Sequence, residues 1–203
     1  MARPRSAGYE GQRDQILAAA ARLFATRGYT AATMQDVAAA CEVSKATLYH
    51  YVRDKQGLLR LITVSHVARL EGLVLAVQAE RLHPQAHLQG LIERFMQAYA
   101  CAEHEHRVLT EDVKFLDPAN RDEVLAAQRR VVAAFAQAVA ACRPELQPAG
   151  LHTPLAMLLF GMMNWTFTWL KPAGRLSHEQ LAAVVVALFF GGLPAVQAAV
   201  PGA

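Results

Sequence analysis

The chain has 203 residues, of which 54% are hydrophobic, and its formal net charge is only +3. This length allows one or two domains with a substantial core, and the apolar composition indicates extensive burial that extends to a subunit interface. Alternating β-branched patterns are rare while Ala, Leu, Gln, Glu and Arg dominate, which argues against a β-rich protein and predicts an all-α fold.

Charge is unevenly distributed along the sequence. The first 60 residues carry nine Lys and Arg against five Asp and Glu, whereas the remainder carries eleven against twelve. A basic N-terminal region on a near-neutral body is typical of a polyanion-binding module joined to a second domain. We therefore divide the chain into an N-terminal domain over residues 10–60 and a C-terminal domain over residues 61–203.

The cysteines and the N-terminus bear on the cellular compartment. Cys41, Cys101 and Cys142 are scattered, without paired metal-ligand spacing, and suit a reducing cytosol better than a disulfide framework. A redox-sensing role for Cys41 is left open. The first residues, with Arg3 and Arg5, contain no apolar stretch resembling a signal peptide. We expect a cytoplasmic protein.

Three helices are predicted in the N-terminal domain. The first covers about residues 12–26 and ends at Gly28, a residue suited to a left-handed helix cap. Thr33 is a favourable N-cap for the second helix, with Asp36 as its acidic companion three residues later. Ser44 caps a short third helix. Two short helices separated by a tight turn predict a helix-turn-helix.

Six more helices complete an expected total of about nine. A long fourth helix opens at Asp54, runs toward Val77 and joins the two domains. The others are expected over residues 84–99, 108–115, 118–142, 153–170 and 181–191, the last with Ser177 in a capping-box pattern.

The third helix displays side chains suited to a DNA groove. Leu48 and Val52 share its inner face, so Ala46 and His50 point outward. In a helix-turn-helix the second helix reads base edges in the major groove while neighbouring residues hold phosphates. The alternative to DNA binding is a purely structural role, in which this short helix only packs against its neighbours. The candidate DNA-contacting residues are Thr33, Ser44, Lys45, Ala46, Thr47, Tyr49, His50, Tyr51 and Lys55.

An enzyme is the first alternative class of function. His104-Glu105-His106 is the nearest approach to a metal or acid–base cluster, but its spacing places the histidines on different sides of a helix. No nucleophile elbow or phosphate loop is visible. We expect no enzyme, catalytic residue, metal site or cofactor.

A membrane-associated helical protein is the second rival, because residues 153–170 and 181–200 approach the length that spans a bilayer. Gly191, Gly192 and Pro194 interrupt the second stretch. Paired helices in a dimer interface would be equally apolar, so we expect no membrane partner. The candidate dimerisation residues are Phe160, Leu181, Val184, Val185, Leu188 and Phe189.

Residues 13–29 and 33–55, which include Thr-Leu-Tyr-His-Tyr-Val-Arg-Asp-Lys, resemble the DNA-binding domain of the TetR family of bacterial regulators. One departure is Glu42, where that family usually has glycine in the turn. The resemblance implies a homodimer that represses transcription from a pseudo-palindromic operator. It also implies release of the DNA when a small molecule binds the C-terminal domain.

The C-terminal domain is similar to a TetR subgroup that senses acyl-CoA thioesters, through residues 160–177 and 114–118. Thr168 occupies a position between two tryptophans where that subgroup often has a basic residue. A plain hydrophobic effector, including a substrate of an efflux pump under the regulator's control, is the open alternative. The candidate effector-binding residues are Phe95, Tyr99, Phe115, Met162, Asn164, Trp165 and Trp169.

Overall fold

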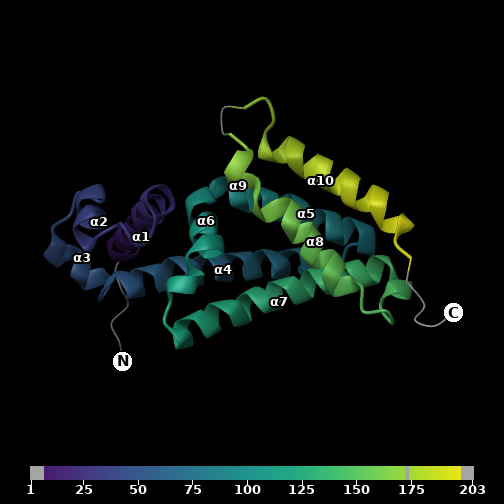
Figure 1. Cartoon of the computed structure of the whole chain (residues 1–203), viewed down its shortest axis with the longest axis horizontal. Coiled ribbons are helices and arrows are strands. Elements are labelled where there is room, and N and C mark those ends of the chain that lie inside the picture. Colours follow the sequence, from purple (N-terminus) through teal and green to yellow (C-terminus); the bar gives the residue numbers. More distant parts are fainter. Residues whose placement is uncertain (1–6, 172–173, 198–203) are drawn as a thin grey trace. The chain divides into compact units, whose positions relative to one another are not determined.

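The computed structural model describes residues 7–171 and 174–197, which contain helices and no strand (Figure 1). An all-α fold is therefore confirmed, with nine helices in this part of the chain when α8 and the short α9 after it are counted as one. The helices are α1 (Ala7–Arg27), α2 (Met34–Ala40), α3 (Lys45–Tyr51), α4 (Lys55–Ala79), α5 (Pro84–Cys101), α6 (Glu103–Glu111), α7 (Pro118–Cys142), α8 (His152–Asn164), α9 (Thr166–Trp169) and α10 (His178–Gly192).

Some of the sequence features used above fall on residues that the structure does not describe. The basic N-terminal residues Arg3 and Arg5 and the last part of the apolar stretch 181–200 lie outside the described residues.

The chain forms two compact units whose boundary falls within α4 and α7. The first contains the chain up to Val67 together with Ala102–Leu125, and the second contains Ala68–Cys101 together with the chain from Ala126 onward. α6 packs against α1 and therefore belongs to the same unit as the helix-turn-helix.

The helix ends of the first unit follow from local capping. α1 ends at Gly28, which has a φ of 86° and donates its N–H to the Phe24 carbonyl at 2.9 Å. The Thr33 side chain accepts from the Asp36 N–H at 3.1 Å, and the Asp36 carboxylate accepts from the Thr33 N–H at 2.9 Å. This capping box satisfies two N–H groups that the first turn of α2 leaves unpaired.

The core of the first unit joins α1, α4 and α6. Phe24 is 1% exposed and Leu58 is fully buried. His66 on α4 and His106 on α6 are both buried, and their Nε2 and Nδ1 atoms lie 3.4 Å apart. At the surface, Arg60 makes a bidentate contact with Glu123, its Nη2 lying 2.7 Å from Oε2.

An aromatic cluster forms the core of the second unit. Phe95 on α5 meets Phe135 on α7 with ring centroids 4.8 Å apart, and Phe135 meets Phe160 on α8 at 4.7 Å. α10 packs along α5 and begins at a capping box formed by Ser177 and Gln180.

Two expected helices have different limits. The helix expected over residues 153–170 is interrupted at Trp165, where the Thr166 hydroxyl donates to the Met163 carbonyl at 3.0 Å and the Thr168 hydroxyl to the Trp165 carbonyl at 2.6 Å. Threonine bonds of this kind compete with the helical hydrogen bonds.

The helix expected from residue 108 begins instead at Glu103 and is followed by a 3-10 turn at Val113–Phe115. Its early start is favoured by the acidic side chains of Glu103 and Glu105 in the first turn, which complement the helix dipole.

Two described helical segments, Pro118–Cys142 and His178–Ala195, are long and apolar enough to cross a membrane by length and composition alone. Core helices of soluble proteins pass the same test. Phe135 and Val139 of α7 and Val185 and Phe189 of α10 are indeed buried within the fold.

Candidate DNA-binding surface and effector region

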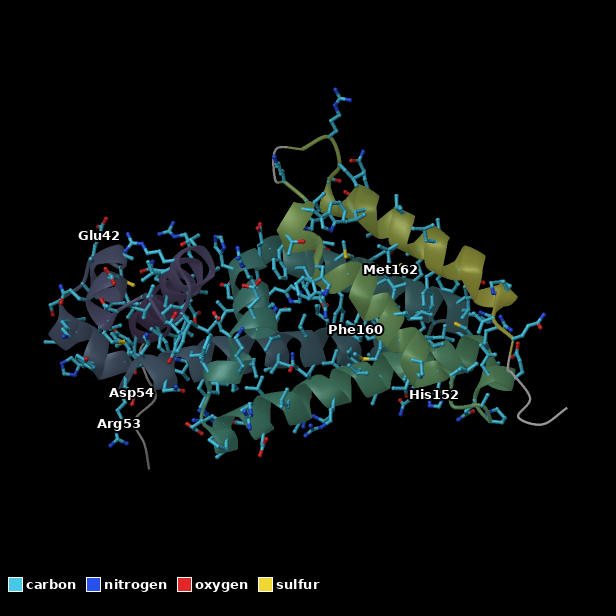
Figure 2. The ribbon with its side chains drawn as sticks, viewed as in Figure 1. Glu42, Arg53, Asp54, His152, Phe160 and Met162 are labelled. Atoms are coloured by element: carbon cyan, nitrogen blue, oxygen red, sulfur yellow. The ribbon has the colours of Figure 1, made fainter. Side chains whose placement is uncertain are left out.

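The turn between α2 and α3 sets the direction of the candidate recognition helix. The Glu42 N–H donates to the Ala39 carbonyl at 3.2 Å and the Val43 N–H to the Ala38 carbonyl at 3.0 Å, the two bonds of a Schellman motif. This motif needs a left-handed residue, and Glu42 has a φ of 55°. Glu42 is exposed at this turn (Figure 2), so a charged side chain occupies a backbone position that favours glycine.

α3 begins at Ser44, whose hydroxyl accepts from the Thr47 N–H at 3.0 Å. Leu48 is fully buried beneath the helix and Val52, its C-cap, is 4% exposed. Because these apolar residues fix the inner face, the opposite face is presented to solvent. The exposed candidates are Thr33, Ser44, Lys45, Ala46, Tyr49 and His50, and Thr47 is half-buried.

Two candidate DNA contacts have other roles in the structure. The Tyr51 hydroxyl donates to Gln12 Oε1 on α1 at 2.7 Å, and its ring stacks on Tyr9 at 4.6 Å. Tyr51 therefore attaches the end of α3 to α1, and we remove it from the set of side chains proposed to reach DNA.

Lys55 likewise faces inward. Its Nζ donates to the carbonyls of Tyr29 and Ala32, each at 2.9 Å, and to that of Thr30 at 3.3 Å. An ammonium group has three donors, so these bonds leave none for a phosphate. A local sequence pattern does not predict this role of Lys55, because the loop between α1 and α2 surrounds it only in the folded chain.

Tyr29 connects this loop to the residues after α6. Its ring lies under Lys55 Nζ at 4.5 Å and stacks on Phe115 at 5.3 Å. The Phe115 carbonyl accepts from Gln56 Nε2 at 2.6 Å. Phe115 therefore lies in the first unit, packed against the α1–α2 loop, whereas the other candidate effector-binding residues lie in the second unit.

A buried acid lies near the same cluster. Asp112 is 8% exposed, and its burial, with a smaller effect of Glu111, raises its pKa to about 6 against the opposing charges of Lys114 and Arg107. Burial also raises the pKa of Tyr29, with further contributions from the Asp54 and Asp112 charges.

The candidate effector residues of the second unit are spread between core and surface. Phe95 is fully buried, and Tyr99 is 3% exposed and donates its hydroxyl to Asn164 Oδ1 at 3.0 Å. Burial raises the pKa of Tyr99. Trp165 and Trp169 are 52% and 53% exposed. Phe95 and Tyr99 therefore pack in the core and the two tryptophans face solvent, while Met162 is half-buried.

Two hollows in the second unit lie away from these residues. One has a volume of about 480 Å³ and lies between α4 and α7; the other, of about 780 Å³, lies between α5 and the start of α10. The first is lined by Glu71, Val74, Leu75, Gln78, Arg130, Val131, Ala133, Ala134 and Gln137. No local sequence pattern predicts this hollow, because its lining comes from two helices about 60 residues apart.

The candidate dimerisation residues also separate into two groups. Phe160, Leu181, Val185 and Phe189 are between 3% and 7% exposed and pack inside the unit. Val184 and Leu188 are 44% and 64% exposed on α10. Met157 and Leu158 on α8, which were not anticipated, are 53% and 66% exposed.

Among the described residues, no group of three or more His, Cys, Asp or Glu side chains is arranged to hold a metal ion. Within the His104-Glu105-His106 segment, only His106 is buried.

Comparisons with known proteins agree along most of the chain. Residues 16–62 match the model of the family described as bacterial regulatory proteins, tetR family, and residues 81–193 match a tetracyclin repressor-like C-terminal domain. The transcriptional repressor KstR2 of Mycolicibacterium smegmatis is 25% identical over 197 residues, covering 90% of each chain.

Solved structures agree as well. A TetR-family regulator from Bordetella parapertussis is 34% identical, with a TM-score of 0.86 over 94% of this chain and 100% of its own. AibR in complex with isovaleryl coenzyme A and operator DNA is 28% identical, with a TM-score of 0.75 over 87% of this chain and 97% of its own. With both domain models matched in order, and a structural relative of this identity along nearly the whole chain, the protein belongs to the TetR family of transcriptional regulators.

Proposed function

We propose that this regulator represses transcription as a cytoplasmic homodimer bound to a pseudo-palindromic operator, and that a small hydrophobic or acyl-CoA-type effector releases it. The observation that carries the DNA-binding part is the exposed face of α3. Lys45, Ala46, Tyr49 and His50 lie on this face above buried Leu48. They offer cationic, apolar and hydrogen-bonding groups to a major groove.

The operator can be found by selecting bound sequences from a randomised duplex library with the full-length protein. We expect a twofold-symmetric site with half-site centres about 34–36 Å apart, or a multiple of that spacing. Lys45→Ala should weaken binding to the selected duplex about tenfold or more, because a good base contact contributes about 1–3 kcal/mol. Arg129→Gln, an exposed cation on α7, is the matched control. Equal affinity for selected and random duplexes would overturn the proposal.

The dimer is supported by apolar side chains that the second unit leaves in solvent. Val184 and Leu188 on α10, with Met157 and Leu158 on α8, are each at least 44% exposed. Burying such side chains against a second copy removes apolar area from water, and twofold dimers are the commonest symmetric assembly.

The effector class is supported by AibR, whose structure was solved with isovaleryl coenzyme A and operator DNA. We therefore favour a CoA thioester over the hydrophobic substrate of an efflux pump. The two are separated by adding isovaleryl coenzyme A or a lipophilic cation to the preformed operator complex and following fluorescence anisotropy. Release by the cation alone would reverse the choice. Membership of the TetR family also favours a transcriptional regulator over a membrane-associated protein.

A further inference from the structure

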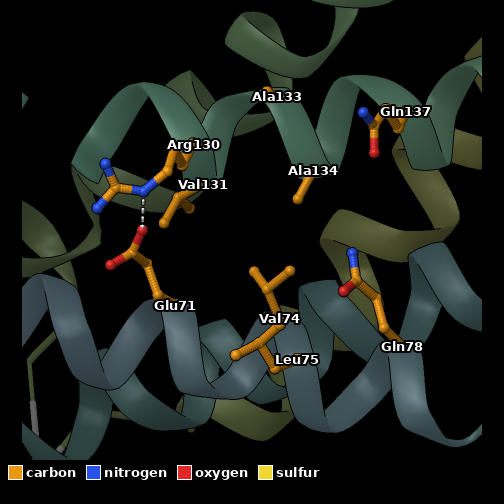
Figure 3. Close-up of a pocket in the computed structure, with 9 residues that line it drawn as sticks. All are labelled: Glu71, Val74, Leu75, Gln78, Arg130, Val131, Ala133, Ala134 and Gln137. Atoms are coloured by element: carbon orange, nitrogen blue, oxygen red, sulfur yellow. Dashed lines mark hydrogen bonds and ion pairs between the residues drawn. The ribbon is translucent and has the colours of Figure 1, made fainter. Parts of the chain in front are cut away.

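The groove between α4 and α7 changes in chemical character along its length, from an ion pair at one end to two glutamines at the other (Figure 3). Glu71 and Gln78 line it from α4, and Arg130 and Gln137 line it from α7. Each pair is seven residues apart, or about two helical turns, so its members share a helix face and mark ends about 10 Å apart.

The first end carries a positioned cation. Arg130 Nε donates to Glu71 Oε1 at 2.6 Å, and the Arg130 side chain is 63% exposed. The carboxylate orients the guanidinium through Nε, the atom that the dashed line joins to it, and Figure 3 shows one outer nitrogen on the side away from the carboxylate. The Nη groups are suited to the paired oxygens of a phosphate.

The middle of the groove is lined by apolar side chains, several of which are small. Val74 and Val131 are 6% and 5% exposed and form its floor, while Leu75 is 66% exposed at its edge. Ala133 and Ala134 reach only a short way from α7 (Figure 3). A branched aliphatic group seated here would cover Leu75 and gain free energy from the apolar area removed from water.

The second end carries two carboxamides. Gln78 and Gln137 extend from opposite helices and are both exposed (Figure 3). Each offers donors and an acceptor, the complement of a ligand amide, which also has one N–H and one carbonyl.

We propose that this groove binds the 4′-phosphopantetheine arm of a CoA thioester, a ligand class that rests on the proposed function. That arm carries a phosphate, then a carbon with two methyl groups, then two amides, in this order. The groove presents Arg130, then the valines and Leu75, then the two glutamines, in the same order. A fatty acid or a lipophilic cation would leave the guanidinium or the carboxamides without a complementary partner.

The test uses calorimetric titration of the full-length protein with 4′-phosphopantetheine and with pantetheine, which lacks the phosphate. Wild type should bind the phosphorylated probe about tenfold more tightly, a difference of about 1.4 kcal/mol, because the guanidinium makes charge-assisted hydrogen bonds to the phosphate. Arg130→Gln should abolish that preference and leave pantetheine affinity unchanged. Arg129→Gln, the adjacent exposed cation, should retain it. A preference that survives Arg130→Gln overturns the inference.

A second variant tests the groove itself. Ala134→Leu should fill its middle and lower affinity for both probes at least tenfold, whereas Ala141→Leu, an exposed position on α7 outside the groove, should not. Thermal melts of each variant monitor folding. Wild-type affinity in Ala134→Leu contradicts the inference.

Operator release distinguishes failure of the site from failure of the effector proposal. If isovaleryl coenzyme A releases wild type and Ala134→Leu equally, the groove assignment fails while the proposed function stands. If no CoA thioester releases wild type, the effector proposal fails, although 4′-phosphopantetheine binding at Arg130 would still be measured independently by calorimetry.

Discussion

Single residues in the first unit hold unfavourable conformations or surroundings next to the candidate DNA surface. Glu42 has a left-handed backbone, and Asp112 is a carboxyl group removed from water. Neither feature contributes to a hydrophobic core. Both are costs that the surrounding packing of the unit offsets, and each can be removed by one substitution.

Glu42→Gly should raise the free energy of unfolding by about 0.5–1 kcal/mol. The left-handed region costs a residue with a Cβ about 1–2 kcal/mol, and the greater unfolded-state entropy of glycine offsets part of the gain. Urea denaturation measures the change. Gln35→Gly, at an exposed position inside α2, should instead lower the free energy of unfolding by about 1 kcal/mol. A similar loss at both positions would contradict the role assigned to the turn.

Asp112→Asn should stabilise the protein near pH 8 and have little effect near pH 4. The pKa of about 6 lies above the ordinary 3.8, so the folded state binds the proton more readily than the unfolded state. Stability from this group is therefore greatest at low pH and is lost as pH rises through about 4 to 6.

Chemical denaturation across this pH range, compared with Asp122→Asn at an exposed position, provides the measurement. A constant difference between wild type and Asp112→Asn at every pH would show that the carboxyl charge is not responsible.

At the scale of elements, helix ends were predicted best where a side chain caps the backbone. Thr33, Ser44 and Ser177 each accept the expected hydrogen bond from a residue three positions later. The break at Trp165 was missed, because a run of apolar residues does not reveal threonine hydroxyls that bond to carbonyls three residues back.

Ser177→Ala should lower the free energy of unfolding by about 1 kcal/mol, because it removes the acceptor for the Gln180 N–H in the capping box of α10. Thermal denaturation followed by circular dichroism is a suitable measurement. Ser177→Thr keeps the hydroxyl and should recover most of the loss. If threonine and alanine are equally destabilising, the cap is not the cause.

For the whole molecule, the exposed apolar side chains of α8 and α10 predict self-association through the second unit. Leu188 is 64% exposed, whereas neighbouring Phe189 is 6% exposed. Introducing a charge at Leu188 therefore tests whether this residue lies in a dimer interface, whereas a substitution at Phe189 would test the packing of the core.

Leu188→Glu should convert the dimer to a monomer in analytical ultracentrifugation while leaving the helical circular dichroism spectrum unchanged, because a buried unpaired charge across an interface costs several kcal/mol. Operator affinity should fall with it. Leu82→Glu, at an exposed position after α4 and outside the groove, is a control for added charge. A Leu188→Glu variant that remains dimeric would place the interface elsewhere.

Operator affinity should also fall steeply between about 50 and 200 mM salt, because each phosphate contact releases condensed counterions. The slope of log affinity against log salt concentration should be smaller for Lys45→Ala if Lys45 contacts a phosphate, and unchanged if it reaches only a base edge. A flat response of the wild type would contradict a phosphate-binding surface.

The helical fold, most helix ends and the outward face of α3 could be predicted from the amino-acid sequence, because they depend on residue periodicity and on caps within a few positions. The three-dimensional fold was needed to establish the role of Lys55, whose donors bond to carbonyls of the α1–α2 loop. It also decided which apolar residues of α10 are core, and it revealed the groove between α4 and α7. These features depend on contacts between segments far apart in the chain, and local patterns carry no information about which distant segment covers a given side chain.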